Sequence, residues 1–164
     1  MTRPDPTCIF IVEDEPAFAK AARHVLETKN FANVHTFENG EACIEKLNLQ
    51  PEIILLDYNL GEDRMNGLEV LKILKKRIPD VQIIFLSAVE SLEVATNTIN
   101  HGAYDYVVKG ETAFERVKSL LRRIVFENQI KKENLNLRRS RKIVYSIILV
   151  LLAAIAALTI LQVS

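Results

Sequence analysis

"IILLD" (residues 53–57) is an unbroken run of aliphatic residues that ends on an aspartate. Two other stretches have the same form: "CIFIV" (8–12) is followed by Glu13 and Asp14, and "VQIIFL" (81–86) is followed by Ser87. Runs without polar alternation are typical of strands that are buried on both faces of a parallel sheet. We therefore expect the three runs to form the central strands of one sheet.

Two further strands and several helices complete this pattern. "ANVHTF" (32–37) is shorter and alternates, as an edge strand does, and "YDYVV" (104–108) supplies a fifth strand. Helical patterns follow each strand and begin near residues 16, 40, 67, 91 and 111. Strands that alternate with helices predict an α/β fold with a doubly wound five-stranded parallel sheet, flavodoxin-like and in the order 2-1-3-4-5.

The charges are divided unevenly along the chain, although the 164 residues have a formal net charge of zero. Residues 1–117 carry 19 Asp/Glu against 12 Lys/Arg, and residues 118–164 carry 9 Lys/Arg against 2 Asp/Glu. Such asymmetry indicates two parts with different surroundings. We predict one domain at residues 1–126, a charged helical stalk at 127–142 and a separate C-terminal segment.

The C-terminal segment is apolar. No charged residue occurs between Ile143 and Ser164, and a helix of this length matches the ~30 Å hydrocarbon core of a bilayer. We predict a transmembrane helix from Ile143 to Val163, and we assign the preceding basic run "RRSRK" (138–142) to the cytoplasmic side of the membrane rather than to nucleic acid. A buried core helix and a cleaved lipid-anchor signal are the alternatives.

Five polar side chains fall at the carboxyl ends of the predicted strands, where open parallel sheets form their sites. They are Glu13, Asp14, Asp57, Ser87 and Lys109. Crowded carboxylates repel one another, and Mg²⁺, which prefers oxygen ligands, would relieve that repulsion.

We predict that Mg²⁺ is held by carboxylates of this group, Asp14 and Asp57 among them, with the backbone carbonyl of Asn59 as a further ligand. The Asp57 carboxylate can then accept a phosphoryl group, while Ser87 and Lys109 bind the phosphoryl oxygens.

Each residue also has a purely structural interpretation. Asp57 could be a loop acid, Glu13 and Asp14 could cap the helix that follows them, and Ser87 could be a strand-end hydroxyl. Tyr106 could be only a packed aromatic.

Four motifs, "IFIVEDE", "IILLDYNL", "IIFLSA" and "GAYDYVVKG", together resemble the receiver domain of bacterial two-component response regulators over residues 7–125. The resemblance implies that Asp57 accepts phosphate from a phosphohistidine of a sensor kinase and that Glu13 and Asp14 hold Mg²⁺. It also implies that Ser87 moves toward the phosphoryl group and that Tyr106 rotates with it, as the parts of a switch.

The sequence departs from the family pattern at two places. The loop "DYNLGEDRMNG" places Gly67 ten positions after Asp57 and lacks a proline that usually follows the acceptor. Lys109 is followed by Gly110, where the family usually has proline.

We therefore expect a phosphoacceptor that is not an enzyme, tethered to the bacterial inner membrane and facing the cytoplasm. With no effector domain recognised, its output would come through protein contacts. The expected partners are a sensor histidine kinase or a phosphotransfer protein, and a homodimer could form through the fifth helix and the stalk. The alternatives are a phosphorylation-independent membrane scaffold and a small phosphate-ester hydrolase, which lacks support because Val89, two residues after Ser87, cannot activate water.

Overall fold

A computed structural model describes residues 5–163, except for the side chains of residues 139 and 149–163. The chain divides into two compact units, Met1–Arg122 and Arg123–Ser164.

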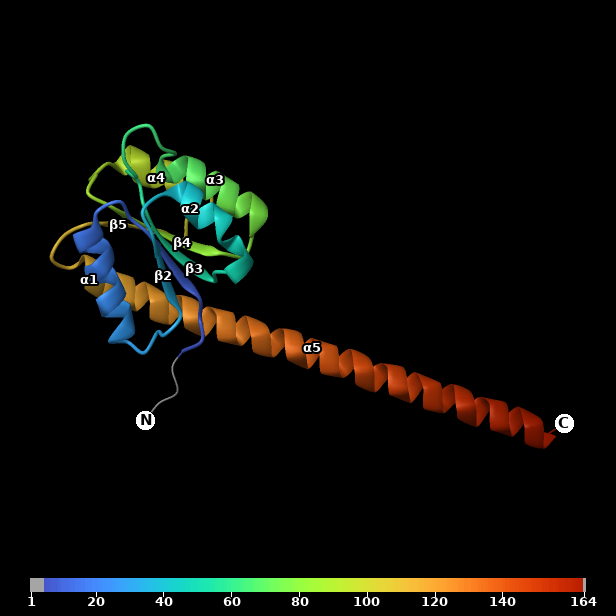
Figure 1. Cartoon of the computed structure of the whole chain (residues 1–164). Helices are drawn as coiled ribbons and strands as arrows, with labels where there is room; N and C mark the ends of the chain where they lie inside the picture. Colours follow the sequence, from blue (N-terminus) through green and yellow to red (C-terminus); the bar gives the residue numbers. More distant parts are fainter. Residues whose placement is uncertain (1–4, 164) are drawn as a thin grey trace. The chain divides into compact units, whose positions relative to one another are not determined.

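The first unit is built on a five-stranded parallel sheet in the order β2-β1-β3-β4-β5, which confirms the predicted fold (Figure 1). The strands are β1 (Ile9–Val12), β2 (Val34–Phe37), β3 (Ile53–Asp57), β4 (Gln82–Ser87) and β5 (Asp105–Val108). The helices are α1 (Pro16–Glu27), α2 (Gly40–Glu45), α3 (Gly67–Arg77), α4 (Leu92–Asn100) and α5 (Ala113–Val163), and a short 3₁₀ helix, η1 (Leu47–Leu49), follows α2.

The apolar runs in the sequence became the inner strands. Every residue of β1 and β3 is buried, and so is every residue of β4 after Gln82. The strand β2 lies at the edge of the sheet, as predicted, and Val34 is the buried residue among its four. Its burial does not follow a strict alternation, since Thr36, two positions after Val34, is exposed.

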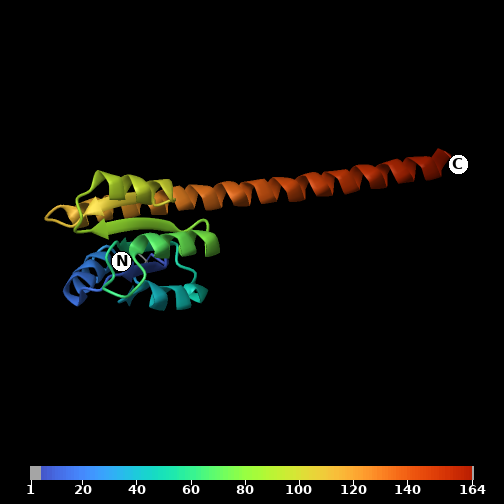
Figure 2. The ribbon, with the colours of Figure 1, turned by 90° about the horizontal axis from the view of Figure 1, so that it is seen from above.

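Helices cover both faces of the sheet. α1 lies on one face and α2 and α3 on the other (Figures 1 and 2). On the face of α2 and α3, Phe10, Ile54 and Phe85 from successive strands pack with Cys43 and Leu71. Because helices cover both faces of the sheet, the inner strands carry no polar residue between their first and last residues.

The strand register brings the ends of the strands to one level. Val12 pairs with Leu56, and Asp57 pairs with Leu86. In the neighbouring pair of strands, β4 and β5, Ser87 pairs with Val108. The residues that follow these pairs emerge together at one edge, which is where the sequence predicts a site.

The second unit consists of the helical backbone of α5 from residue 123 onward. Among the residues that the structure describes, no helix is long and apolar enough to cross a membrane. The predicted span at 143–163 includes residues 149–163, whose side chains lie outside the described part, so the span stays a prediction. The predicted domain boundaries at 126 and 142 also stay predictions.

Candidate functional site

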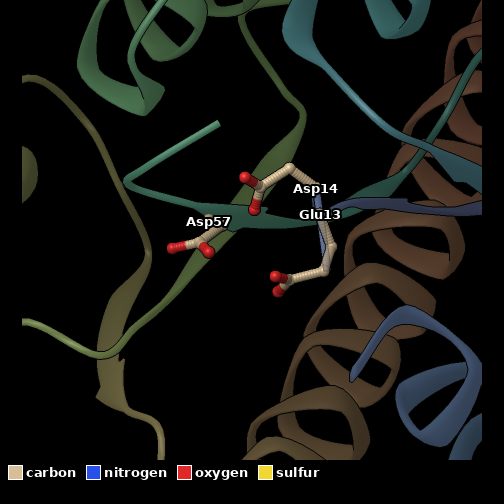
Figure 3. A group of neighbouring side chains, drawn as sticks. All are labelled: Glu13, Asp14 and Asp57. Atoms are coloured by element: carbon tan, nitrogen blue, oxygen red, sulfur yellow. The ribbon is translucent and has the colours of Figure 1, made fainter. Parts of the chain in front are cut away.

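Three carboxylates gather where β1 and β3 end. Glu13 and Asp14 directly follow β1, and Asp57 is the last residue of β3. One oxygen from each lies within 4.8 Å of the others, and the three groups face a common space (Figure 3). Glu13 and Asp57 are buried, whereas Asp14 is exposed. The cluster therefore has two inner acids and one acid that remains open to solvent.

Lys109 is the cation that joins the two inner acids. Its Nζ donates to Asp57 Oδ2 at 2.6 Å and to Glu13 Oε1 at 2.8 Å. The backbone N–H of Lys109 donates to the carbonyl of Ser87 at 2.8 Å, which fixes the start of the side chain beside the end of β4. The ammonium also lies 4.4 Å from the centre of the Phe18 ring, a distance suited to a cation–π contact.

The contact of the Phe18 ring with Lys109 was not expected from the sequence. The place of Phe18 on the apolar face of α1 predicts only core packing, and its ring does stack on Phe114 at the start of α5, 5.1 Å between centroids. Its position four residues after Asp14 was the only sequence signal that could have suggested a second role beside the site.

Burial dominates the electrostatics of the inner acids. Burial raises the pKa of the Glu13 carboxyl to about 7, although the hydrogen bond from Lys109 opposes this shift. Burial would by itself lower the pKa of the Lys109 ammonium, but its bonds to Asp57 and Glu13 outweigh burial and raise that pKa. One ammonium among three acids leaves an excess of negative charge at the edge of the sheet.

The donor set fits Mg²⁺ better than a softer metal. It consists of carboxylate oxygens, and the described cluster contains neither histidine nor cysteine. The Asn59 backbone N–H donates to Asp57 Oδ1 at 3.3 Å, so this residue does lie beside the acceptor. The role of its carbonyl as a ligand stays a prediction.

The loop between β3 and α3 is closely packed at its far end. A Cβ on Gly67 would lie 2.3 Å from the carbonyl oxygen of Asp57 and 2.9 Å from the Phe85 ring, so no larger residue fits there. Asn66 caps α3 in a reciprocal pair with Glu69, each side chain accepting a backbone N–H of the other residue. The longer loop therefore still returns to the backbone of the acceptor residue.

A second anchor holds the middle of this loop. Glu41, in the first turn of α2, accepts the backbone N–H of Met65 through Oε1 at 3.1 Å. This bond lowers the pKa of the Glu41 carboxyl. The role of Glu41 could not be predicted from the sequence, because nothing local distinguishes it from other acids at helix starts.

Ser87 and Tyr106 meet at one backbone position, Val89. The Val89 N–H donates to Ser87 Oγ at 3.1 Å, and the Tyr106 hydroxyl donates to the Val89 carbonyl at 2.6 Å. Ser87 is buried, and the ring of the half-buried Tyr106 stacks on Phe85, 6.2 Å between centroids. The structure thus connects these two predicted switch residues through the backbone of a single residue, Val89.

The structure brings together most of the predicted site. Glu13, Asp14, Asp57 and Lys109 form one charged group, and Ser87 lies at the end of the neighbouring strand. Tyr106 lies in β5 and contacts the loop after Ser87 rather than the acids.

Comparison with known proteins agrees with this geometry. The family model of the response regulator receiver domain matches residues 9–122. This chain belongs to the response regulator receiver domain family. The crystal structure of the receiver domain of NtrX from Brucella abortus is similar, with a TM-score of 0.65 and 26% identity over 71% of this chain and 96% of that chain.

Two curated relatives contain a similar receiver domain within longer proteins. The nitrogen assimilation regulatory protein NtrX of Azorhizobium caulinodans is 33% identical over 101 residues, which is 62% of this chain and 22% of that protein. The luminescence regulatory protein LuxO of Vibrio campbellii is 37% identical over 100 residues, 60% of this chain and 21% of that protein. This chain thus spans about a fifth of the length of these relatives.

Proposed function

We propose that this receiver domain takes a phosphoryl group from a phosphohistidine onto Asp57. The observation that carries the proposal is the placement of Asp57 Oδ2, 2.6 Å from the ammonium of Lys109 and beside Glu13 and Asp14. A buried carboxylate that is paired with a cation and surrounded by acids is costly to maintain, which favours a chemical role over a structural one.

In the proposed step, an oxygen of Asp57 forms a bond to phosphorus while the P–N bond of the phosphohistidine breaks. The histidine nitrogen keeps the electron pair and takes up a proton. Lys109 donates to a phosphoryl oxygen and stabilises its negative charge. Ser87 has a hydroxyl proton that its bond with the Val89 N–H does not use, so it can donate to another phosphoryl oxygen.

Glu13, Asp14 and Asp57 would hold Mg²⁺, with the Asn59 carbonyl as a further ligand. The ion, when bound, supplies positive charge that offsets the negative charge of the acids and of the incoming phosphoryl group. The excess of acids over Lys109 and the absence of softer donors in this described cluster support the assignment.

Val89 gives a physical basis for a switch at Ser87 and Tyr106. If Ser87 turns toward the phosphoryl group, it gives up the Val89 N–H, and the Tyr106 hydroxyl is bonded to the carbonyl of that same residue. A movement at one residue therefore disturbs the hydrogen bond of the other, and the surface near α4 and β5 changes with it.

We further propose that residues 143–163 anchor the protein in the bacterial inner membrane, with the receiver domain on the cytoplasmic side. The uncharged stretch from residue 143 and the basic run before it support this orientation. A tethered receiver domain would meet a membrane-bound kinase at a raised effective concentration. Deletion of residues 143–163 is expected to move the protein from the carbonate-washed membrane fraction to the supernatant.

The phosphorylation test uses the full chain, Mg²⁺ and acetyl phosphate as a small donor. We expect one equivalent of an acid-labile, hydroxylamine-sensitive phosphate per chain, and none in Asp57→Asn. Absence of the modification in the unchanged protein would leave only a membrane scaffold. Continuous release of many equivalents of phosphate, without accumulation on the protein, would instead identify a hydrolase.

A further inference from the structure

The helical unit exposes large apolar side chains, and before residue 143 these stand on an otherwise polar helix. Five of them follow a regular spacing and are here called the seam: Phe126, Ile130, Leu137, Val144 and Ile147. Each seam side chain is at least 42% exposed. Phe126, Ile130 and Leu137 lie before the proposed membrane span, where apolar residues that stay exposed at a regular spacing indicate an unfilled contact surface. Val144 and Ile147 continue the same stripe into the span.

The seam has the period of a coiled coil. Ile130, Leu137 and Val144 are separated by seven residues, and Phe126 and Ile147 lie four residues before and three residues after this series. An a/d pattern with a period of seven places these residues along one stripe of the helix. β-branched residues at the a positions, such as Ile130 and Val144, favour a two-stranded assembly.

Most of the cations of the stalk lie on the outer side of the helix, and Arg141 flanks the seam at an e position. In the register set by the seam, Lys131, Lys132, Arg138 and Lys142 occupy the outer b, c and f positions. Two copies that met at the seam would therefore turn these cations away from each other and toward solvent. Such a charge distribution suits a second copy of this chain, because identical basic helices that met at any outer face would repel.

We infer that the seam pairs with the seam of a second copy in a parallel two-stranded coiled coil. This inference goes beyond phosphoryl transfer, and only the parallel direction rests on the membrane tether proposed above. In that pairing like residues face each other, so Leu137 contacts the partner's Leu137.

The pairing is expected to be weak, because polar residues interrupt the seam. The two remaining seam positions within the stalk hold Glu133 and Ser140 rather than apolar residues. Facing Glu133 side chains repel each other, and polar residues at core positions lower the stability of a coiled coil while they set its register. Confinement to one membrane would raise the effective concentration and promote pairing.

Leu135 provides a matched control for Leu137. Both are leucines in the same stalk, and they are 56% and 62% exposed. Leu135 takes the f position, on the side of the helix away from the seam. A general tendency of exposed leucines to associate would affect both positions equally, whereas the seam predicts a difference.

The test is disulfide cross-linking of the full chain in phospholipid vesicles. The native Cys8 and Cys43 are both buried, so cross-links report the introduced cysteine. Leu137→Cys is expected to give a covalent dimer within minutes of mild oxidation, and Leu135→Cys at least several-fold less. Equal cross-linking at both positions, or none at Leu137→Cys, would overturn the inference.

Two further variants test the details of the pairing. Ile130→Cys is expected to cross-link to itself in a parallel dimer, and failure with efficient cross-linking at Leu137→Cys would overturn the parallel direction. Glu133→Leu in the Leu137→Cys background is expected to increase the dimer fraction several-fold, because it removes the facing charges. An unchanged or lower dimer fraction would contradict the assigned register.

Discussion

In most folded proteins charged groups are exposed and apolar groups are buried, and the two units of this chain depart from this distribution in opposite ways. The receiver domain buries charged groups, namely Glu13, Asp57 and most of Lys109, whereas the helical unit exposes apolar groups such as Leu137. Buried charges and exposed apolar surface both cost free energy in an isolated chain. In the proposals made above, each departure has its own binding partner: a cation and a phosphoryl group for the buried acids, and a second copy of the chain for the exposed apolar residues.

The largest expected effect comes from removing the cation that pairs with the buried acids. Lys109→Met keeps the aliphatic stem but leaves Asp57 and Glu13 without a partner, so we expect a loss of about 3 kcal/mol in the free energy of unfolding without metal. Added Mg²⁺ should restore part of that loss. The measurement is urea denaturation at neutral pH with and without the ion.

Lys118→Met is the matched control for this variant. Lys118 Nζ also lies 2.6 Å from a carboxylate, that of Glu115, but the Glu115 side chain is 73% exposed. Solvent screens exposed pairs, so this variant should lose far less stability than Lys109→Met. Similar losses for the two lysines would mean that burial of the acids does not distinguish the site.

A glycine near the acceptor gives the next largest effect. In Gly67→Ala the new methyl group would meet the Asp57 carbonyl oxygen and the Phe85 ring. Because one of these neighbours is backbone, we expect a loss of about 2–3 kcal/mol in the free energy of unfolding. Gly110→Ala is the control, since nothing lies within 4 Å of its added Cβ, and it should change stability little. A loss in Gly67→Ala as small as that in Gly110→Ala would show that the loop shifts freely to accommodate the methyl group.

The pH dependence of stability sharpens the electrostatic side of the comparison. The folded-state pKa of Glu13 is raised from 4.5 to about 7, so the folded protein keeps a proton that the unfolded chain releases. Stability of the metal-free protein should therefore fall by up to about 3 kcal/mol as the pH rises from 4.5 to about 7, and then level off. Urea denaturation across this range checks the trend.

Glu13→Gln is the control for the pH series, because it cannot take up or release that proton. Its stability should decline much less over the same range. A wild-type stability that rises through this window would show that the pKa of Glu13 is lowered in the folded protein rather than raised.

The sequence predicted the frame of the receiver domain well, because that frame depends on local patterns. The runs at 8–12, 53–56 and 81–86 became β1, β3 and β4 with shifts of a residue at their ends. The parallel register then placed the predicted acids at one edge, since strand ends coincide in such a sheet. Asp57, Glu13, Asp14 and Lys109 could thus be grouped before any coordinates.

What could not be predicted depends on contacts between distant residues. Glu41 and Met65 are 24 positions apart, and no local pattern announces their hydrogen bond. The contact of Phe18 with Lys109 could not be predicted either, because a sequence does not show whether an aromatic on an apolar helix face also covers a lysine. The 3₁₀ helix at Leu47–Leu49 was missed because it is too short for a periodic signal.

The smallest expected effect lies in the helical unit and completes the comparison. Leu137→Asn and Leu135→Asn both replace an exposed leucine, so each should change the thermal stability of the diluted, monomeric chain by less than about 0.5 kcal/mol. Near-UV circular dichroism in mild detergent follows the unfolding. At higher protein concentration only Leu137→Asn should lower the dimer fraction, measured by analytical ultracentrifugation, because only that position lies in the seam. A large loss of monomer stability in either variant would show that the leucine is packed within its own chain. The apolar groups of the helical unit would then be buried in the usual way, and the difference between the two units would disappear.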